Sequence, residues 1–335
     1  MKGVNILAIE TSCDETAAAV VKNGRQVVSQ ALYTQISIHK EFGGVVPEIA
    51  SRNHVVKLPQ VVEAAIDGAG GMDNIDAIAV TSGPGLVGAL LTGVSYAKGL
   101  AYAAKKPLVP VNHIAGHICA NYISHADLKP PFLCLVVSGG HTQIVWAKDE
   151  TTYETLGRTR DDAAGEAIDK VARVLGLAYP GGPNLQELAK QGDENKYRFP
   201  RSFRGEDHLD FSFSGLKTAV INLLHGFDQK DEVYNKADVA ASFLRNVADT
   251  LTKNTFEAAR RTGAKILAVA GGVSANEQIR MAFEKKAGEA GIALYFPEAG
   301  YCTDNAAMIA SCAYFEYEKG TRAGLDLNAQ PVMEL

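Results

Sequence analysis

The chain has 335 residues, of which 47% are hydrophobic and 21% are charged, and its formal net charge is −5. This length and composition indicate a globular protein with room for two domains and a sizeable core. The negative charge excludes a protein that binds nucleic acid over its whole surface, so a nucleic-acid site would need a local basic patch or a partner protein.

Cysteine usage and the lengths of the apolar runs indicate the cellular compartment in which the protein works. The five cysteines are odd in number, widely spaced and free of any CxxC pair, which disfavours a disulfide framework or a cysteine-type zinc site. The apolar run at 4–10 is too short for the core of a signal peptide, and no run approaches the length of a transmembrane helix. We therefore expect a cytoplasmic protein with no membrane segment.

The first part of the chain predicts strands followed by helices. Strands are expected at 4–10 and 16–22, and a third follows the Asn23-Gly24 pair, which is a hairpin signal. Residues 47–68 have helical periodicity and start with a proline, a residue favoured at the first helical position. The remaining elements expected here are a buried strand at 76–80, a helix rich in glycine and alanine at 86–104, and a strand at 107–111.

The same order of elements then returns. A strand, a tight turn and a strand are expected over 132–148, followed by a strand at 152–159, a helix at 164–175, a polar insertion at 177–232, a long helix at 236–262, strands at 266–270 and 293–297, and a helix at 303–318. When the first segment is laid on the second, Ser12 falls on Ser138 and Thr16 on Thr142. We interpret this as a duplicated α/β domain with two similar lobes facing each other across a cleft. The expected lobes are 1–128 and 129–302, the latter carrying the insertion, with 303–330 packing back on the first lobe.

Three polar turns follow buried strands, at 10–16, 138–142 and 270–276. Glycine lets backbone N–H groups approach an anion closely, and Ser, Thr and a helix N-terminus add donors. One such turn is as often structural as functional, but three at corresponding strand ends favour nucleotide binding. Neither a Walker A motif nor a GxGxxG follows a strand, which disfavours the P-loop and Rossmann folds.

The stretch NHIAGH at 112–117 holds two histidines, His113 and His117, one helical turn apart. A helix here places both imidazoles on one face, which is the spacing of metal ligands. The alternative is that the two rings cap or fill a seam between helices. A zinc protease of the HExxH type needs a glutamate after the first histidine as general base, and that position is Ile114. Proteolysis of this type is therefore disfavoured.

Motifs over nearly the whole chain resemble the TsaD family of tRNA threonylcarbamoyladenosine transferases, of the ASKHA superfamily, once described as glycoproteases. They are AIETSCDET, FGGVVPEIASRNH, TSGPGLVGALLTG, NHIAGH, VSGGHTQ, GEAIDKVAR, YPGGP, FSFSGLKT, AGGVSAN and YCTDNAAMI. The resemblance implies an α/β, two-lobed ASKHA fold with a central nucleotide and metal cleft. The implied reaction is metal-assisted transfer of the threonylcarbamoyl group from threonylcarbamoyl-AMP to N6 of adenosine 37 in tRNAs that read ANN codons.

The resemblance also assigns roles to residues. It places one divalent metal, Fe²⁺ or Zn²⁺, on His113, His117 and Asp304. It makes Asp14 and Glu15 catalytic, where a carboxylate takes the proton from the adenine amine, and the alternative is a solvated acidic turn. The positions implied to bind ATP or the adenylate are Ser138, Gly139, Gly140, His141, Thr142, Asp169, Gly182 and Asn276.

Two of these assignments have simpler structural alternatives, and five further histidines have no assigned role. Asp169 is expected to bond ribose hydroxyls, and its alternative is a helical pair with Arg173. His141 lies in the phosphate turn, where contact with the ligand is favoured over a role in ending a strand. The other histidines show no ligand spacing and are expected to be structural or superficial: His39, His54, His125, His208 and His225.

The insertion predicts contact with tRNA. Basic and aromatic residues alternate at 196–204, namely Lys196, Tyr197, Arg198, Phe199, Arg201, Phe203 and Arg204, and Arg158, Arg160 and Lys217 would extend the patch. Such a pattern can grip phosphates and stack bases, although a solvated face of the insertion is nearly as well supported.

The resemblance names two bacterial partners, an inactive paralogue of the same fold (TsaB) and a small P-loop ATPase (TsaE). The helix at 86–104 could form a homodimer face or pack internally. Two other function classes stay open: a small-molecule kinase of the same fold, in which the paired histidines have no task, and a scaffold, which could dispense with the metal ligands and the acidic pair.

Overall fold

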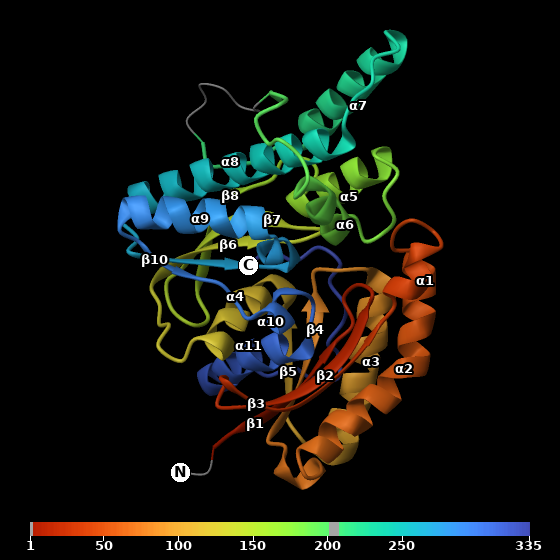
Figure 1. Ribbon diagram of the computed structural model, residues 1–335. Helices are drawn as coiled ribbons and strands as arrows, with labels where there is room; N and C mark the ends of the chain where they lie inside the picture. The colour runs from red at the N-terminus through yellow and green to blue at the C-terminus, as the bar shows by residue number, and fades with distance from the viewer. Residues whose placement is uncertain (1–2, 201–207) are drawn as a thin grey trace. The chain divides into compact units, whose positions relative to one another are not determined.

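The computed structural model describes residues 3–200 and 208–335, which form two compact units. Unit 1 runs to Pro130 and adds Ala147–Tyr153 and Pro297–Leu335, and unit 2 comprises Pro131–Trp146 and, within the described ranges, Glu154–Phe296. Each unit is built on a five-stranded sheet with helices packed against it (Figure 1).

The sheet of unit 1 has the strand order β3-β2-β1-β4-β5. Its strands are β1 (Asn5–Glu10), β2 (Glu15–Lys22), β3 (Gln26–Thr34), β4 (Ala77–Gly83) and β5 (Leu108–Asn112). The first three form an antiparallel meander, whose Asn23-Gly24 turn has the positive φ angles of 53° and 68° that a tight hairpin turn requires. Strands β1, β4 and β5 run parallel, so their C-terminal ends meet at one edge, and the candidate residues of unit 1 follow that edge.

The helices of unit 1 lie on both faces of its sheet. They are α1 (Ile36–Lys40), α2 (Pro47–Gly68), η1 (Met72–Asn74), α3 (Val87–Ala104), α4 (His113–Ser124), α10 (Ala299–Cys302) and α11 (Ala306–Lys319). Helices α2 and α3 cover one face, and α4 and α11 cover the other (Figure 1). Helix α2 has the bounds that its periodicity predicts.

The expected helix at 303–318 is wrong at its start. Helix α11 begins at Ala306 because the side chain of Asn305 caps it, with Oδ1 accepting a hydrogen bond from the Met308 N–H at 2.9 Å. Asp304 therefore lies outside the helix, in the short link from α10.

The segment after α11 crosses the ends of β4 and β5. The Gln330 N–H donates to the Ser82 carbonyl at 2.7 Å, and the side-chain amide of Asn112 donates to the Glu334 carbonyl at 3.1 Å. A Cβ at Gly83 would collide with the Gln330 carbonyl oxygen, so the segment passes close to the β4 backbone. Residues 330–334 thus pack against both strands that lead into the candidate site.

The sheet of unit 2 repeats the topology of the first, with the order β10-β9-β6-β7-β8. Its strands are β6 (Phe132–Val137), β7 (Thr142–Ala147), β8 (Tyr153–Arg158), β9 (Ile266–Ala270) and β10 (Ala293–Tyr295). Its helices are α5 (Ala164–Val174), α6 (Gly181–Ala189), α7 (Ser214–Gln229), α8 (Lys236–Thr262), η2 (Gly272–Ala275) and α9 (Glu277–Ala290). Figure 1 shows α8 and α9 side by side over this sheet.

Two aromatic residues of the basic stretch, Tyr197 and Phe199, pack against or within the core of unit 2. Phe199 is only 9% exposed, and the ring of Tyr197 packs on Phe227 with 5.8 Å between centroids. Burial of apolar surface therefore keeps Phe199 from stacking on bases, whereas Tyr197 stays partly exposed and its contact with tRNA stays a prediction. Arg201, Phe203 and Arg204 lie outside the described residues.

All five cysteines are free thiols. Within residues 3–200 and 208–335, no helix is both long enough and apolar enough to cross a membrane.

Candidate metal centre and nucleotide-type residues

The metal-type histidines lie at the start of α4, directly after β5. Asn112 caps this helix, because its Oδ1 accepts hydrogen bonds from the N–H groups of Ile114 at 2.8 Å and Ala115 at 3.3 Å. Both histidines are buried, and their rings meet edge to face with 4.7 Å between centroids. The capped helix therefore presents both imidazoles from one face.

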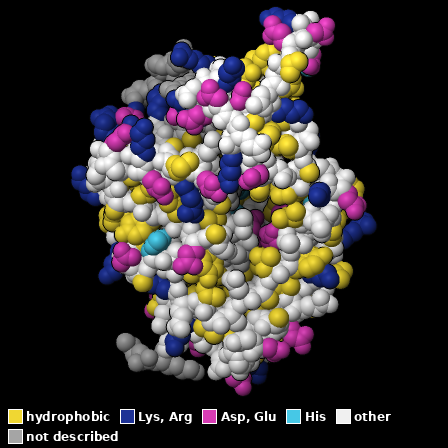
Figure 2. Space-filling view, viewed as in Figure 1, with side chains coloured by type: hydrophobic (Ala, Val, Ile, Leu, Met, Phe, Trp, Pro, Cys, Tyr) yellow, Lys and Arg dark blue, Asp and Glu magenta, His cyan; other side chains and the backbone are white. Residues whose placement is uncertain are grey.

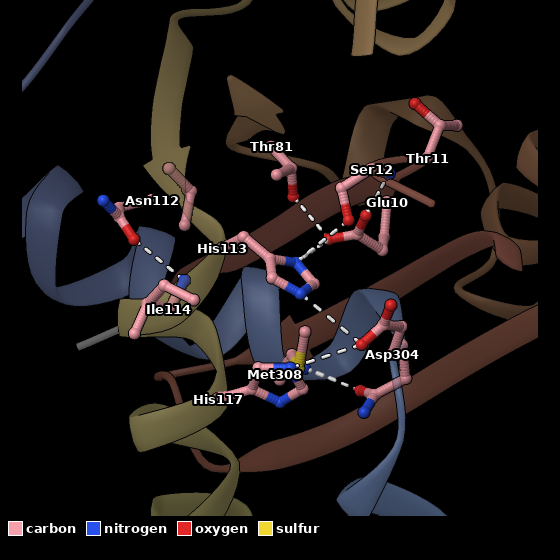
Figure 3. Close-up of polar contacts among 12 residues, drawn as sticks. Glu10, Thr11, Ser12, Thr81, Asn112, His113, Ile114, His117, Asp304 and Met308 are labelled. Carbon is pink, nitrogen blue, oxygen red and sulfur yellow. Dashed lines mark hydrogen bonds and ion pairs between the residues drawn. The ribbon is translucent and has the colours of Figure 1, made fainter. Parts of the chain in front are cut away.

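Close packing of α11 on α4 brings Asp304 to these rings. A Cβ at Gly116 would lie 2.6 Å from Cδ1 of Ile309, so the missing side chain leaves room for α11. Oδ1 of Asp304 lies 3.2 Å from Nε2 of His117 and 3.5 Å from Nε2 of His113 (Figure 3). The three ligand-type atoms lie within 4.8 Å of one another, so the structure brings together the three residues that the sequence analysis assigned to a metal.

The donor set fits a divalent transition metal. Both ring nitrogens of His117 are buried: Nε2 faces Asp304 at 3.2 Å, and Nδ1 has no hydrogen-bond partner among the described residues. Burial without a partner costs free energy unless a ligand satisfies the group. Two imidazole nitrogens and one carboxylate oxygen leave coordination positions open, as in catalytic zinc and non-haem iron sites.

The charges of the centre support one another. Burial opposes ionisation of His113, but the carboxylates of Asp304 and Glu10 outweigh it and raise the pKa of His113 to about 10. Burial likewise disfavours the Asp304 carboxylate, but the facing histidines hold its pKa well below its usual range. The centre therefore keeps Asp304 ionised, which is the form that binds a metal.

The sequence analysis missed the carboxylate behind His113. Glu10, 1% exposed at the end of β1, places Oε2 3.1 Å from Nδ1 of His113 and accepts a hydrogen bond from Thr81 Oγ1 at 2.6 Å (Figure 3). Ser12 Oγ is also 3.1 Å from that ring nitrogen. With the Nδ1 N–H directed to Glu10, a metal ion would displace the proton at Nε2 and bind the lone pair of that nitrogen. The available signal was an acidic residue ending a buried apolar strand.

Asp14 ends the turn between β1 and β2, and Glu15 is the first residue of β2, in the same unit as the metal-type residues. Burial, followed by the charge of Asp304, raises the pKa of Asp14. Burial raises the pKa of Glu15 to about 8, although Oε1 accepts a hydrogen bond from Thr34 Oγ1 at 2.9 Å. The effect of Asp304 on both groups indicates that this acidic turn lies beside the metal centre.

The turn at 138–142 in unit 2 is tight and open to solvent at its glycines. The Ser138 N–H donates to the His141 carbonyl at 2.8 Å, and Ser138 Oγ accepts from the His141 N–H at 3.2 Å. A Cβ at Gly139 or Gly140 would meet no atom within 4 Å. Thr142 Oγ1 accepts from the Ala164 N–H at 2.9 Å and so ties the turn to the start of α5.

Two other segments of unit 2 pack closely against this turn through glycines. A Cβ at Gly165 would lie 2.6 Å from the Ser138 carbonyl oxygen, and one at Gly271 would collide with the Val137 carbonyl. The turns after β6 and β9 and the start of α5 therefore lie together.

Asp169 and Asn276 each accept a hydrogen bond from a backbone N–H at the start of a helix. Asp169 Oδ1 accepts from the Gly181 N–H at 2.9 Å, beside Gly182 at the start of α6. Asn276 Oδ1 accepts from the Ile279 N–H at 3.1 Å and caps α9, which leaves its amide N–H₂ as the group free to face a ligand.

The basic residues of unit 2 are exposed but mixed with acids. Lys196 and Arg198 are exposed, whereas Arg160 pairs with Asp210 at 2.8 Å. On the face shown in Figure 2, basic and acidic side chains are interspersed over α8 and α9. Any nucleic-acid contact here would rest on particular residues and not on a broad field of one sign.

Comparison with known proteins identifies the family. The family model described as TsaD, tRNA N6-adenosine threonylcarbamoyltransferase, matches residues 26–311. A tRNA N6-adenosine threonylcarbamoyltransferase of Clostridium botulinum (strain 657 / Type Ba4) is 57% identical over 335 residues, which covers 100% of this chain and 98% of the relative. One of Clostridium beijerinckii (strain ATCC 51743 / NCIMB 8052) is 56% identical over 331 residues, 98% of each chain.

Solved structures agree in fold. The crystal structure of T. kodakarensis HypF has a TM-score of 0.66 at 17% identity, covering 95% of this chain and 48% of that one. Component A of (R)-2-hydroxyglutaryl-CoA dehydratase from Acidaminococcus fermentans has a TM-score of 0.54 at 15% identity, covering 94% of this chain and 98% of that one. These likenesses confirm the expected α/β fold of ASKHA type. The sequence matches go further, and by them the chain belongs to the TsaD family of tRNA N6-adenosine threonylcarbamoyltransferases.

Proposed function

We propose that this chain forms N6-threonylcarbamoyladenosine in tRNA, by transferring the threonylcarbamoyl group of threonylcarbamoyl-AMP to N6 of adenosine 37 in tRNAs that read ANN codons. The observation that carries the proposal is the group formed by buried His113 and His117 with half-buried Asp304, beside the acidic turn of Asp14 and Glu15, in a chain 57% identical to named transferases. The kinase alternative gives the histidine pair no task, and the protease alternative lacks a general base between the histidines.

The metal-type residues would hold one divalent ion, and we infer Fe²⁺ or Zn²⁺ from the nitrogen-rich donor set. Such an ion supplies Lewis-acid polarisation of a bound acyl or phosphate oxygen. The chain's own contribution is orientation: Glu10 fixes the His113 ring, and Asn112 fixes the start of the helix that carries both histidines.

The acidic turn would handle the proton of the nucleophile. An adenine amine is a weak nucleophile and must lose a proton as it attacks the carbamoyl carbon, so a carboxylate within reach serves as general base. A base works best when its pKa lies near the operating pH, and burial brings Glu15 to about 8. Glu15 Oε2 is buried without a hydrogen bond from the described residues, which supports Glu15 as the base and Asp14 as its electrostatic neighbour.

Unit 2 would hold the AMP part of the donor, or ATP. The open glycines of the 138–142 turn leave backbone N–H groups accessible to a phosphate, and His141 and Thr142 flank them. Asp169 and Asn276, with Gly182, would contact the sugar and base. AMP is a good leaving group, so positioning and charge stabilisation are what the site must supply.

The tRNA and protein partners follow from the proposed reaction. Exposed Lys196 and Arg198 of unit 2 would contact phosphates.

The outer face of α2 and α3 carries an apolar groove with a volume of about 430 Å³, lined by Val55, Leu58, Leu91, Thr92, Ser95 and Tyr96. We infer that an inactive paralogue of the same fold docks there in the cytoplasm, assisted by a small P-loop ATPase, and a second copy of this chain is the alternative occupant.

Reconstitution tests the proposal. The chain, with its paralogue and ATPase partners, is mixed with the adenylate-forming enzyme, threonine, bicarbonate, ATP and tRNA, and N6-threonylcarbamoyladenosine is read by mass spectrometry with and without a chelator. We expect product that depends on the chain and is lost in Asp14→Ala and His117→Ala. Product formation unaffected by both variants, or ATP-dependent phosphorylation of a small molecule without tRNA, would overturn the proposal.

A further inference from the structure

A buried histidine outside the metal centre contacts the acidic turn. His54 on α2 is fully buried, and both of its ring nitrogens are engaged. Nε2 donates to the Cys13 carbonyl at 2.9 Å, and Nδ1 accepts from Thr16 Oγ1 at 2.8 Å. Cys13 and Thr16 are the residues on either side of Asp14 and Glu15, so one imidazole bridges the two ends of the acidic turn.

A second residue fixes the same turn. The Gln35 N–H donates to the Asp14 carbonyl at 3.3 Å, and the Gln35 side-chain amide lies 3.5 Å from Nδ1 of His54 and donates to the Ala50 carbonyl at 3.3 Å. The backbone oxygens of Cys13 and Asp14 are thus both held by groups outside the turn. Burial lowers the pKa of His54, which keeps the ring neutral with one donor and one acceptor, the pair that these contacts use.

We infer that His54 is a positioning residue of the transfer reaction, because its two hydrogen bonds fix the backbone from which Asp14 and Glu15 project. This inference rests on the proposed function. A histidine that only filled the core could be exchanged for an aromatic ring with a loss of stability alone. A histidine that fixes a catalytic turn affects the rate of the chemical step, since small displacements of reacting groups are costly.

Substitutions separate the two hydrogen bonds. His54→Gln keeps a donor near the position of Nε2, and His54→Asn keeps an acceptor near that of Nδ1. His54→Phe keeps the ring and removes both bonds, and Thr16→Val removes only the hydroxyl. Asn53→Ala is the matched control, because the Asn53 amide bonds the Ile49 carbonyl of its own helix at 3.0 Å.

In the reconstituted system we expect kcat of His54→Phe to fall on the order of 10- to 100-fold with KM for the adenylate and tRNA little changed. His54→Gln should lose least, because it retains the bond to the Cys13 carbonyl. Thr16→Val should lower kcat in the wild-type background but add nothing in His54→Gln, where its partner is already missing. The metal affinity of these variants should stay at the wild-type value, and so should the activity of the control Asn53→Ala.

Distinct outcomes overturn the inference. A folded His54→Phe protein with wild-type kcat would do so, and so would losses in all variants that follow only their melting temperatures. If His54→Phe fails to fold, the comparison of His54→Gln with Thr16→Val and their double variant decides. An inactive wild-type system would overturn the proposed function, and with it this inference.

Discussion

Replacing Glu10 by glutamine is a sharp test of the metal centre. The carboxylate accepts from the Ser12 N–H through Oε1 and from Thr81 Oγ1 through Oε2, and Oε2 also faces Nδ1 of His113. An amide has only one acceptor oxygen. Whichever way it turns, an N–H₂ group replaces an acceptor that one of these donors needs.

The magnitude follows from that mismatch. A buried donor left without an acceptor costs about 1–3 kcal/mol, and loss of a carboxylate behind a metal-binding histidine lowers metal affinity about 10- to 100-fold. Both estimates agree, because a tenfold change in affinity corresponds to about 1.4 kcal/mol. We therefore expect Glu10→Gln to bind Zn²⁺ or Co²⁺ about 10- to 100-fold more weakly than the wild type.

Competition titration with a chromophoric chelator measures this affinity directly and does not depend on catalysis. The control for loss of a charge elsewhere in unit 1 is Glu63→Gln, because Glu63 is an exposed glutamate on α2. His117→Ala supplies the lower limit. A Glu10→Gln protein that binds metal as tightly as Glu63→Gln, while His117→Ala does not bind, would refute the reasoning about the His113 ring.

Three further predictions use the same unit. Gly116→Val should lower metal affinity by about 1–3 kcal/mol through overpacking against α11, whereas Gly116→Ala, whose Cβ meets only the movable end of Ile309, should change it little in the same titration. The pKa of Glu15 is raised to about 8 from 4.5, so the folded state holds the proton longer and stability falls as pH rises between those values. Glu15→Gln should therefore raise the melting temperature relative to wild type more at pH 9 than at pH 5, and an equal difference at both values would contradict the shift. Leu91→Asp should abolish co-elution with the same-fold partner without altering metal affinity, and retained co-elution would place that partner elsewhere.

Much of the fold could be predicted from local pattern. Helix α2 begins at Pro47 and ends at Gly68 as its periodicity indicates, because a long amphipathic run with proline at its first position leaves few alternatives. The final helix begins three residues later than its pattern predicts, since the sequence alone does not show that Asn305 supplies the cap. Cap choice depends on where the preceding chain lies, which is a tertiary property.

The candidate site divides in the same way. Spacing suggested His113 and His117 as ligands, but only the resemblance brought in Asp304, which is distant in the chain. His54 was expected to be structural or superficial because it has no ligand spacing, and its full burial agrees with the structural alternative, but its contact with the acidic turn could not be predicted. Its contacts cross from α2 to the link between β1 and β2, and no periodicity within either segment reports such a pairing. Glu10 carried a local signal, because it is an acid that ends a buried strand, but the sequence did not show that it contacts His113.

The segment that crosses β4 and β5 has a practical consequence for handling the protein. Its Glu334 carbonyl accepts from the side-chain amide of Asn112, the residue that caps the metal-type helix. Only Leu335 would separate this contact from a purification tag fused after it, and a steric strain on the tag would reach the start of α4. Metal titrations and activity assays are therefore best done with an N-terminal tag or with the tag removed, and differences between preparations should first be sought at this fusion point.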